Sequence, residues 1–362
     1  MDEIELMTNT ERNLYIAQYG FEHFYNVFMI NVSKNMTSVN LSNSGINNKD
    51  IEIFIKLIIK NNKYQSLITL FLDNNDISQN GAKFLTKSLN ILPHLATLDL
   101  DNNNIGDKGA QYFADLLITN ISLTTLNLSN NNIGDKGVEF IAKSLKINKT
   151  LKTLGLSGNN ISGKGVESLK ICKYLTKLYL GANYIGDNGI KFIAELLENN
   201  KSLECLELSD IGISDDGIKF ITESLSTISN TRNHTYLTRL DLDNNISENG
   251  IKFIAELLKI NKFLVVLDLS DNDINNDKIK FIIESLKINK SLTTLKLYGS
   301  NIDEKEIDII NELLEFNMIN KERIVKERAE EKIYFATIMQ YQYSWYSEFL
   351  KVFDTFAGYE YL

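Results

Sequence analysis

The sequence has few of the residues that build disulfide frameworks, metal sites or basic surfaces. Among 362 residues there are two cysteines, Cys172 and Cys205, three histidines and one proline. The number and spacing of the cysteines indicate neither a disulfide framework nor a zinc site, so we expect a reducing, cytoplasmic location. Lysine and arginine total 38 against 47 acidic residues, a net charge of −9. Because nucleic-acid binding requires a basic face, we expect no nucleic-acid partner.

Long apolar segments and catalytic motifs are also missing. No run approaches about 18 uninterrupted apolar residues, and the first residues, MDEIELMTNTER, are acidic where a secretory leader would be basic. We therefore expect no membrane partner. His23, His94 and His234 lie far apart in the sequence, and GNNISGKG and DNNNIGDKG, which suggest phosphate and calcium loops, are explained by the repeat described below. We expect no cofactor, no metal and no enzymatic activity.

What the sequence does have is one phrase that returns about ten times, mostly every 28 residues. Three of its copies are LATLDLDNNNI from Leu95, LTTLNLSNNNI from Leu123 and LKTLGLSGNNI from Leu151. A fixed period of this length indicates a repeat array. Residues that recur in every unit are therefore attributed to the architecture, and function is sought where the units differ.

Each unit predicts one short strand followed by one helix. In the unit from Leu95, leucines alternate with polar residues, as in a strand with one buried face. After Ile105 the apolar residues recur at helical spacing. The predicted buried face of this helix consists of Ala110, Phe113, Ala114 and Leu117.

Three sets of recurring polar residues are assigned structural roles. Helix N-caps are predicted at the turn positions Asn47, Ser78, Gly106, Gly134, Ser162, Gly186, Ser214, Ser247, Asn275 and Asp303. A ladder of asparagines that bond backbone groups after each strand is predicted at Asn75, Asn103, Asn131, Asn159, Asn183, Asn245 and Asn272. Helix ends in the left-handed conformation are predicted at Asn120, Asn148, Asn200 and Asn289.

These units resemble leucine-rich repeats of the ribonuclease-inhibitor-like class, which are also found in Ran GTPase-activating proteins and NOD-like receptors. The resemblance covers residues 36–319 and implies an α/β leucine-rich repeat solenoid of about ten repeats. Such a solenoid is a curved right-handed superhelix with parallel strands on the concave face and helices on the convex face. The curvature also follows from spacing, because strands stack ~4.8 Å apart whereas helices need about 10 Å.

Several units and both flanks depart from the pattern. The unit from Leu151 is 24 residues long, and the unit from Leu203 has 34, with an insertion that carries Arg232 and is a secondary candidate for contacts. We expect residues 1–35 to form an N-terminal helical cap. Residues 320–362 are predicted to be a helical, aromatic-rich segment that either caps the array or binds a partner through Trp345.

The outward strand positions form the candidate binding surface. Carboxylates gather at both ends of the array, and the middle is small and neutral apart from Lys177 and Tyr179. One interpretation is that these polar residues only keep the face solvated; the other is that they bind a basic partner surface. The residues predicted to contact a partner are Phe71, Asp73, Asp99, Asp101, Tyr179, Glu207, Arg239, Asp241, Asp243, Asp268, Tyr298 and Trp345.

Three functions are compatible with these features. The favoured one is a non-enzymatic scaffold that binds a protein, with a basic surface, on its concave face. The resemblance to Ran GTPase-activating proteins implies the alternative of a small-GTPase regulator, although no signature loop is matched beyond the repeat. An effector or sensor that targets host proteins is the third. The partner's identity and the oligomeric state do not follow from the sequence.

Overall fold

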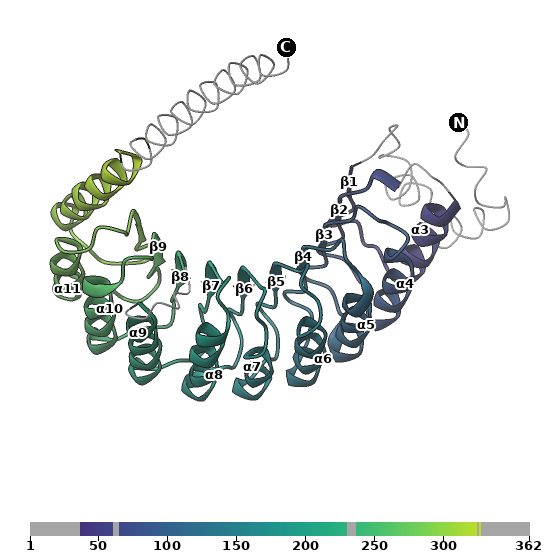
Figure 1. Cartoon of the computed structure of the whole chain (residues 1–362), viewed down its shortest axis with the longest axis horizontal. Helices are drawn as coiled ribbons and strands as arrows, with labels where there is room; N and C mark the ends of the chain where they lie inside the picture. Colours follow the sequence, from purple (N-terminus) through teal and green to yellow (C-terminus); the bar gives the residue numbers. More distant parts are fainter. Residues whose placement is uncertain (1–36, 61–64, 230–236, 324–325, 327–362) are drawn as a thin grey trace, which may run out of the picture.

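A computed structural model describes residues 37–60, 65–229, 237–323 and 326. These residues form an arc in which the strands line the inner side and the helices the outer side (Figure 1). Ten parallel strands pair in chain order in one sheet, which confirms the predicted α/β leucine-rich repeat solenoid. The strands are β1 Ser38–Asn40, β2 Thr69–Phe71, β3 Thr97–Asp99, β4 Thr125–Asn127, β5 Thr153–Gly155, β6 Lys177–Tyr179, β7 Cys205–Glu207, β8 Arg239–Asp241, β9 Val266–Asp268 and β10 Thr294–Lys296.

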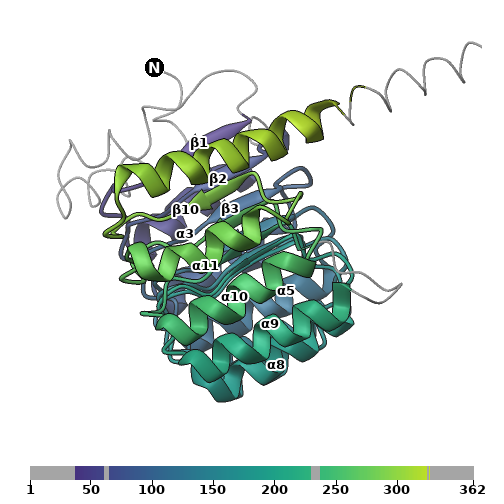
Figure 2. The same cartoon turned by 90° about the vertical axis from the view of Figure 1, so that its left-hand side faces the viewer.

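One helix follows each strand and packs beside the helices of the neighbouring units (Figure 2). The helices are α3 Asn48–Lys60, α4 Gln79–Leu89, α5 Gly106–Thr119, α6 Asp135–Leu145, α7 Gly163–Leu169, α8 Gly186–Asn199, α9 Asp215–Ser229, α10 Glu248–Ile260 and α11 Asn276–Leu286. A further helix begins at residue 304 and is described to residue 323. Each strand–helix pair buries its apolar face against its neighbours, so the array shares one continuous core.

The core contains the residues that the repeat predicts. The middle residue of the strands β2 to β8 is a leucine with no exposed surface, and Ile105 is equally buried where the chain turns toward α5. Phe113, on the inner side of α5, is among the largest fully buried side chains. The predicted helical face of α5, from Ala110 to Leu117, is therefore confirmed.

The asparagine ladder is confirmed as a set of bonds between consecutive units. Asn103 donates from Nδ2 to Leu72 O at 3.0 Å in the preceding unit and to Leu100 O at 3.1 Å in its own. Its Oδ1 accepts the N–H of Ile77 at 2.9 Å. One carboxamide thus satisfies backbone groups that leave the sheet and are shielded from water. The other members with this role are Asn75, Asn131, Asn159, Asn183 and Asn272.

The predicted ladder position in the eighth unit is wrong by one residue. Asn244, not Asn245, donates to Leu208 O at 2.7 Å and accepts from Ile211 N at 2.9 Å. Asn245 is exposed and has a φ of 54°, in the left-handed region. Because this unit lacks one residue before its helix, the ladder position lies one place earlier. Ile211, which replaces the asparagine in the seventh unit, is fully buried.

Helix starts follow the prediction at eight of the ten turns and differ at two. The helices after Asn47, Ser214 and Asp303 begin at the next residue, and Asn47 Oδ1 and Ser214 Oγ accept the N–H groups of Lys49 and Asp216. Ser78, Gly134, Ser162, Ser247 and Asn275 are extended N-cap residues of α4, α6, α7, α10 and α11. In contrast, Gly106 and Gly186 are the first residues of α5 and α8, with φ of 61° and 60°. Glycine adopts this left-handed conformation without steric cost. In this conformation the N–H of each glycine donates to a backbone carbonyl of the next unit.

Acidic residues at the helix starts also cap the helix of the next unit. Asp107 Oδ1 accepts the N–H groups of Gly134 at 2.7 Å and Gly137 at 3.0 Å. Asp135 Oδ1 accepts from Ser162 N at 2.7 Å in the same way. Asp187 and Asp215 repeat the arrangement with Ser214 and Ser247. These side chains complement the positive helix ends and couple neighbouring units.

The predicted left-handed helix ends are wrong. Asn120 and Asn200 have φ of −74° and −93° and are extended. Their carboxamides instead bond the backbone of the turn into the next strand, as Asn120 Oδ1 does with Leu123 N at 2.8 Å. Asn148 adds bonds from Nδ2 to Leu117 O and Asn120 O, so these residues form a second buried ladder at the opposite edge of the array.

In the last described unit this second ladder is incomplete. Asn317 donates from Nδ2 to Asn289 O and Leu292 O, but its buried Oδ1 has no hydrogen-bond partner. The chain continues as a helix there instead of turning, so no turn N–H reaches that oxygen. Phe316, Met318 and Ile319 are exposed. The predicted caps at 1–35 and 320–362 stay predictions, since most of these residues lie outside the described ranges.

Candidate protein-binding surface

The concave face is built from strand residues that parallel pairing places side by side. The third residue of each strand pairs with the third residue of the next, so these residues form one column across the sheet. The first residues of the strands form a second column beside it. The column of third residues consists of Asn40, Phe71, Asp99, Asn127, Gly155, Tyr179, Glu207, Asp241, Asp268 and Lys296. The carboxylates therefore fall into two groups separated by the neutral strands β4 and β5, as the sequence predicts.

The first acidic group consists of Asp73, Asp99 and Asp101, beside Phe71 on β2. Asp99 Oδ1 accepts Asn127 Nδ2 and the N–H of Asp101, both at 3.0 Å. Burial raises the pKa of Asp99, and the charges of Asp73 and Asp101 raise it further against the hydrogen bonds that lower it. The three carboxylates are thus close enough to repel one another.

The second acidic group consists of Glu207, Asp210, Asp241, Asp243, Asp268 and Asp271. Its most buried member, Asp241, binds the Arg239 guanidinium through Oδ2, at 3.1 Å from Nε and 2.8 Å from Nη2. The side chain of Asp241 is 8% exposed and that of Arg239 is 39% exposed. Asp241 Oδ1 is buried and has no hydrogen-bond partner. An acceptor oxygen left in this state is costly unless a donor reaches it.

Two other carboxylates of the second group are held by neighbours. Glu207 Oε2 accepts Ser157 Oγ at 2.8 Å and the N–H of Gly181 at 2.9 Å. A Cβ at Gly181 would lie 1.9 Å from Glu207 Oε1, so a larger residue there would displace the Glu207 carboxylate from this position. Burial raises the pKa of Asp268, but hydrogen bonds from Ser270 and the ion pair with Lys296 outweigh it, and the pKa is lowered.

Asp243 lies between further carboxylates that the strand pattern did not include. Partial burial raises its pKa, and the charges of Asp271 and Asp210 raise it further. Asp210 and Asp271 occupy a turn position with φ of 51° and 53°, where other units have asparagine. Sequence reasoning considered only strand positions and so missed these two residues. The signal was present, because both aspartates stand where Asn102 and Asn130 stand in earlier units.

Aromatic side chains accompany both acidic groups. Tyr179 is partly buried on β6 beside Cys205, and burial together with the hydrogen-bonded Cys205 raises its pKa. Tyr298, beyond β10, is 80% exposed. Phe71, Tyr179 and Tyr298 therefore lie at the start, middle and end of the described face. Trp345 and the Arg232 loop lie outside the described residues.

Both cysteines are buried, free thiols. Burial raises the pKa of Cys172 to about 12, so this thiol stays protonated at neutral pH. Within the described residues, no group of three or more histidine, cysteine, aspartate or glutamate side chains is placed to hold a metal ion. In the same part of the chain, no helix has both the length and the apolarity to cross a membrane.

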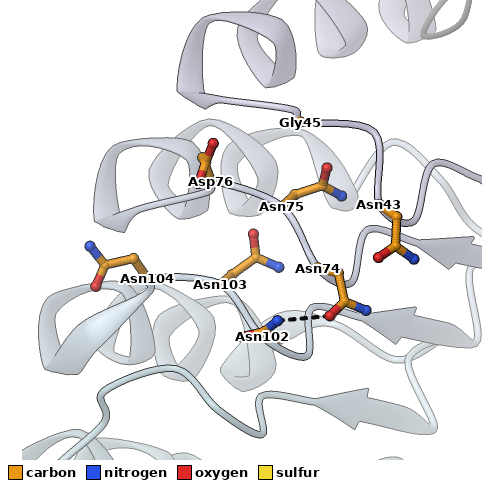
Figure 3. A pocket seen from close by; sticks show the side chains of 8 residues that line it. All are labelled: Asn43, Gly45, Asn74, Asn75, Asp76, Asn102, Asn103 and Asn104. Carbon is orange, nitrogen blue, oxygen red and sulfur yellow. Dashed lines mark hydrogen bonds between the residues drawn. The ribbon is translucent and has the colours of Figure 1, made fainter.

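A hollow of about 440 Å³ lies among the turns that follow β1, β2 and β3 (Figure 3). Its lining is mostly asparagine. Asn75 and Asn103 belong to the ladder, and Asn102 Nδ2 donates to Asn74 Oδ1 at 2.7 Å. Their amide groups are therefore engaged in holding the turns together, and we assign this hollow to the architecture.

A family model described as "Leucine Rich repeat" matches residues 92–114, 119–142, 148–170, 172–194, 199–221 and 261–277. Each of these segments contains one strand, from β3 to β7 and β9, and at least the start of the helix that follows it. These segments of the chain are similar to leucine-rich repeats. Leucine-rich repeat proteins are typically non-enzymatic, and their repeat domains generally bind other proteins.

Solved structures add little to this leucine-rich repeat assignment. A structure titled "Leiomodin-1 Actin-Binding Site 2 (ABS2)" is 16% identical, and the match covers 70% of this chain and 96% of that chain. Its TM-score is 0.26, which is too low to carry an argument about this protein. No curated protein matches the chain.

Proposed function

We propose that this protein is a non-enzymatic scaffold of the ribonuclease-inhibitor-like class that binds a basic surface of another protein on its concave face. The helix in each unit and the 28-residue period support the class. The observation that carries the binding proposal is the crowding of carboxylates in two groups. Burial raises the pKa of Asp99 and Asp243, and the charges of the neighbouring carboxylates raise it further. Like charges held together oppose folding, and such local conflicts concentrate at functional sites.

The exposed carboxylates of the second group support the same proposal. A lysine or arginine of a partner could pair with Asp210 or Asp271, and its charge would reduce the repulsion within the group. Tyr179 and the exposed Tyr298 offer aromatic contact area on the same face as the second acidic group. Small-GTPase regulation and effector or sensor roles stay predictions, to which the described surface adds nothing specific.

Removal of one charge from each acidic group is expected to weaken binding of a basic probe. In the double variant Asp101→Asn/Asp243→Asn, the shape is kept and repulsion is relieved, so the fold should persist. We expect a fluorescently labelled, Lys/Arg-rich peptide to bind about tenfold more weakly, as measured by anisotropy. The difference should shrink at high salt, because ions screen exposed charges.

The matched control removes the same charge from the outer side of the array. Glu198 and Glu223 are exposed on α8 and α9. The variant Glu198→Gln/Glu223→Gln should bind the peptide as the parent protein does. Equal weakening by both double variants would show that only net charge attracts the peptide, and the concave site would then be rejected.

A further inference from the structure

The shortened fifth unit opens a pocket on the side of the array where helices return to strands. Helix α7 has seven residues, whereas its neighbours α6 and α8 have 11 and 14. The missing turn leaves a pocket of about 470 Å³ between the ends of α6 and α7 and the side of α8. Lys146, Lys170 and Lys173 line it together with Tyr174 and Glu195. We call it the lysine pocket.

Positive charge is concentrated at this pocket in an otherwise acidic chain. The Nζ atoms of Lys149 and Lys152 lie 5.6 and 5.9 Å from the centre of the Tyr174 ring. Lys170 pairs with Glu195 at 3.2 Å and with Glu167 at 3.7 Å. Three lysines therefore line the pocket, and two more lie against the Tyr174 ring, in a protein whose net charge is −9.

Helix capping explains part of this arrangement but not all of it. Lysines near a helix C-terminus complement its negative end. After α11, Lys287 occupies the repeat position of Lys146, and Lys290 occupies that of Lys173. Tyr174 is not explained in this way, because it is uncharged; an aromatic residue recurs at its repeat position as Phe263, whereas Ser202 and Ser291 stand there in other units. The loss of a helical turn beside it is also particular to this unit among those described.

We propose that the lysine pocket binds an acidic segment of a partner protein. The charge of the pocket selects carboxylates, and the Tyr174 ring supplies apolar contact area for their side-chain stems. The proposal does not rest on the concave face, which has the opposite charge and would select a basic partner. The protein would then engage acidic and basic surfaces at two separate places.

The test uses the full-length protein and a labelled Glu-rich peptide in an anisotropy titration. Reversal of charge in Lys146→Glu/Lys173→Glu is expected to weaken peptide binding about tenfold, since two favourable pairs become repulsive. The matched control Lys287→Glu/Lys290→Glu reverses the same two repeat positions after α11, away from the pocket. It should change the affinity less than about twofold, since these lysines lie away from the pocket and salt screens exposed charges at a distance.

A third variant tests the pocket without a change of charge. Tyr174→Ser introduces the serine found at this position in several other units. It is expected to weaken peptide binding severalfold while the protein unfolds at a similar temperature. Equal losses in the pocket variant and in the α11 control would overturn the proposal, because they would indicate non-specific attraction. Unchanged affinity in both Lys146→Glu/Lys173→Glu and Tyr174→Ser would overturn it as well.

Discussion

The Asn131→Ala variant is expected to be about 3 kcal/mol less stable than the parent protein. Asn131 is fully buried and makes three bonds from its side chain. Nδ2 donates to Leu100 O at 2.8 Å and Ser129 O at 2.7 Å, and Oδ1 accepts Ile105 N at 3.1 Å. Alanine leaves these backbone groups without partners where water does not reach, and each orphaned group is costly.

The matched control is Asn104→Ala in a neighbouring turn. Asn104 is exposed, and its side chain only accepts a bond from Asn132 Nδ2 at 3.0 Å. We expect its loss to change the free energy of unfolding by less than about 0.5 kcal/mol. Urea denaturation followed by circular dichroism measures both variants. A loss for Asn131→Ala no larger than for Asn104→Ala would contradict the structural role of the ladder.

Removal of Arg239 is expected to destabilise the protein through the charge it leaves behind. The variant Arg239→Val places at this position the residue that Val266 supplies on the next strand. Asp241 Oδ2 then loses its donor, and Oδ1 has none to begin with. Breaking a buried pair leaves an uncompensated charge. Because Arg239 is partly exposed and solvent screens the pair, we expect about 2 kcal/mol, below the range for fully buried pairs.

The double variant Arg239→Val/Asp241→Asn should recover most of this loss, since the buried charge is gone. A double-mutant cycle in chemical denaturation measures the coupling between the two positions. If the two substitutions were simply additive, with the double variant the least stable of the set, Asp241 would not depend on Arg239. The account of the second acidic group would then need revision.

The repeat predicted the strands, the concave columns and most of the asparagine ladder because all of these recur within one unit. The error at Asn245 arose where a single residue is missing, since a count from the first leucine does not show where the deletion lies. The conformation of Asn120 was mispredicted because asparagine suits both a left-handed helix end and an extended turn. The turn's free N–H groups favour the extended form.

Contacts between units were beyond a pattern that describes one unit at a time. The role of Asp107 as a cap for the next helix depends on the distance between adjacent turns. The same holds for Glu207, which crosses two units to bond Ser157. In the candidate surface, the sequence located the charged positions, whereas their burial, pairing and mutual repulsion required the structure.

The most direct test of the concave-face proposal is carboxyl footprinting of the full-length protein with and without the Lys/Arg-rich peptide. A water-soluble carbodiimide labels accessible carboxylates, and mass spectrometry then measures the labelling at each residue. The proposal predicts that bound peptide protects Asp101 and Asp243 while Glu198 and Glu223 are labelled as before. Protection confined to Glu198 and Glu223, or spread evenly over all four residues, would contradict the proposal that the concave face is the binding surface.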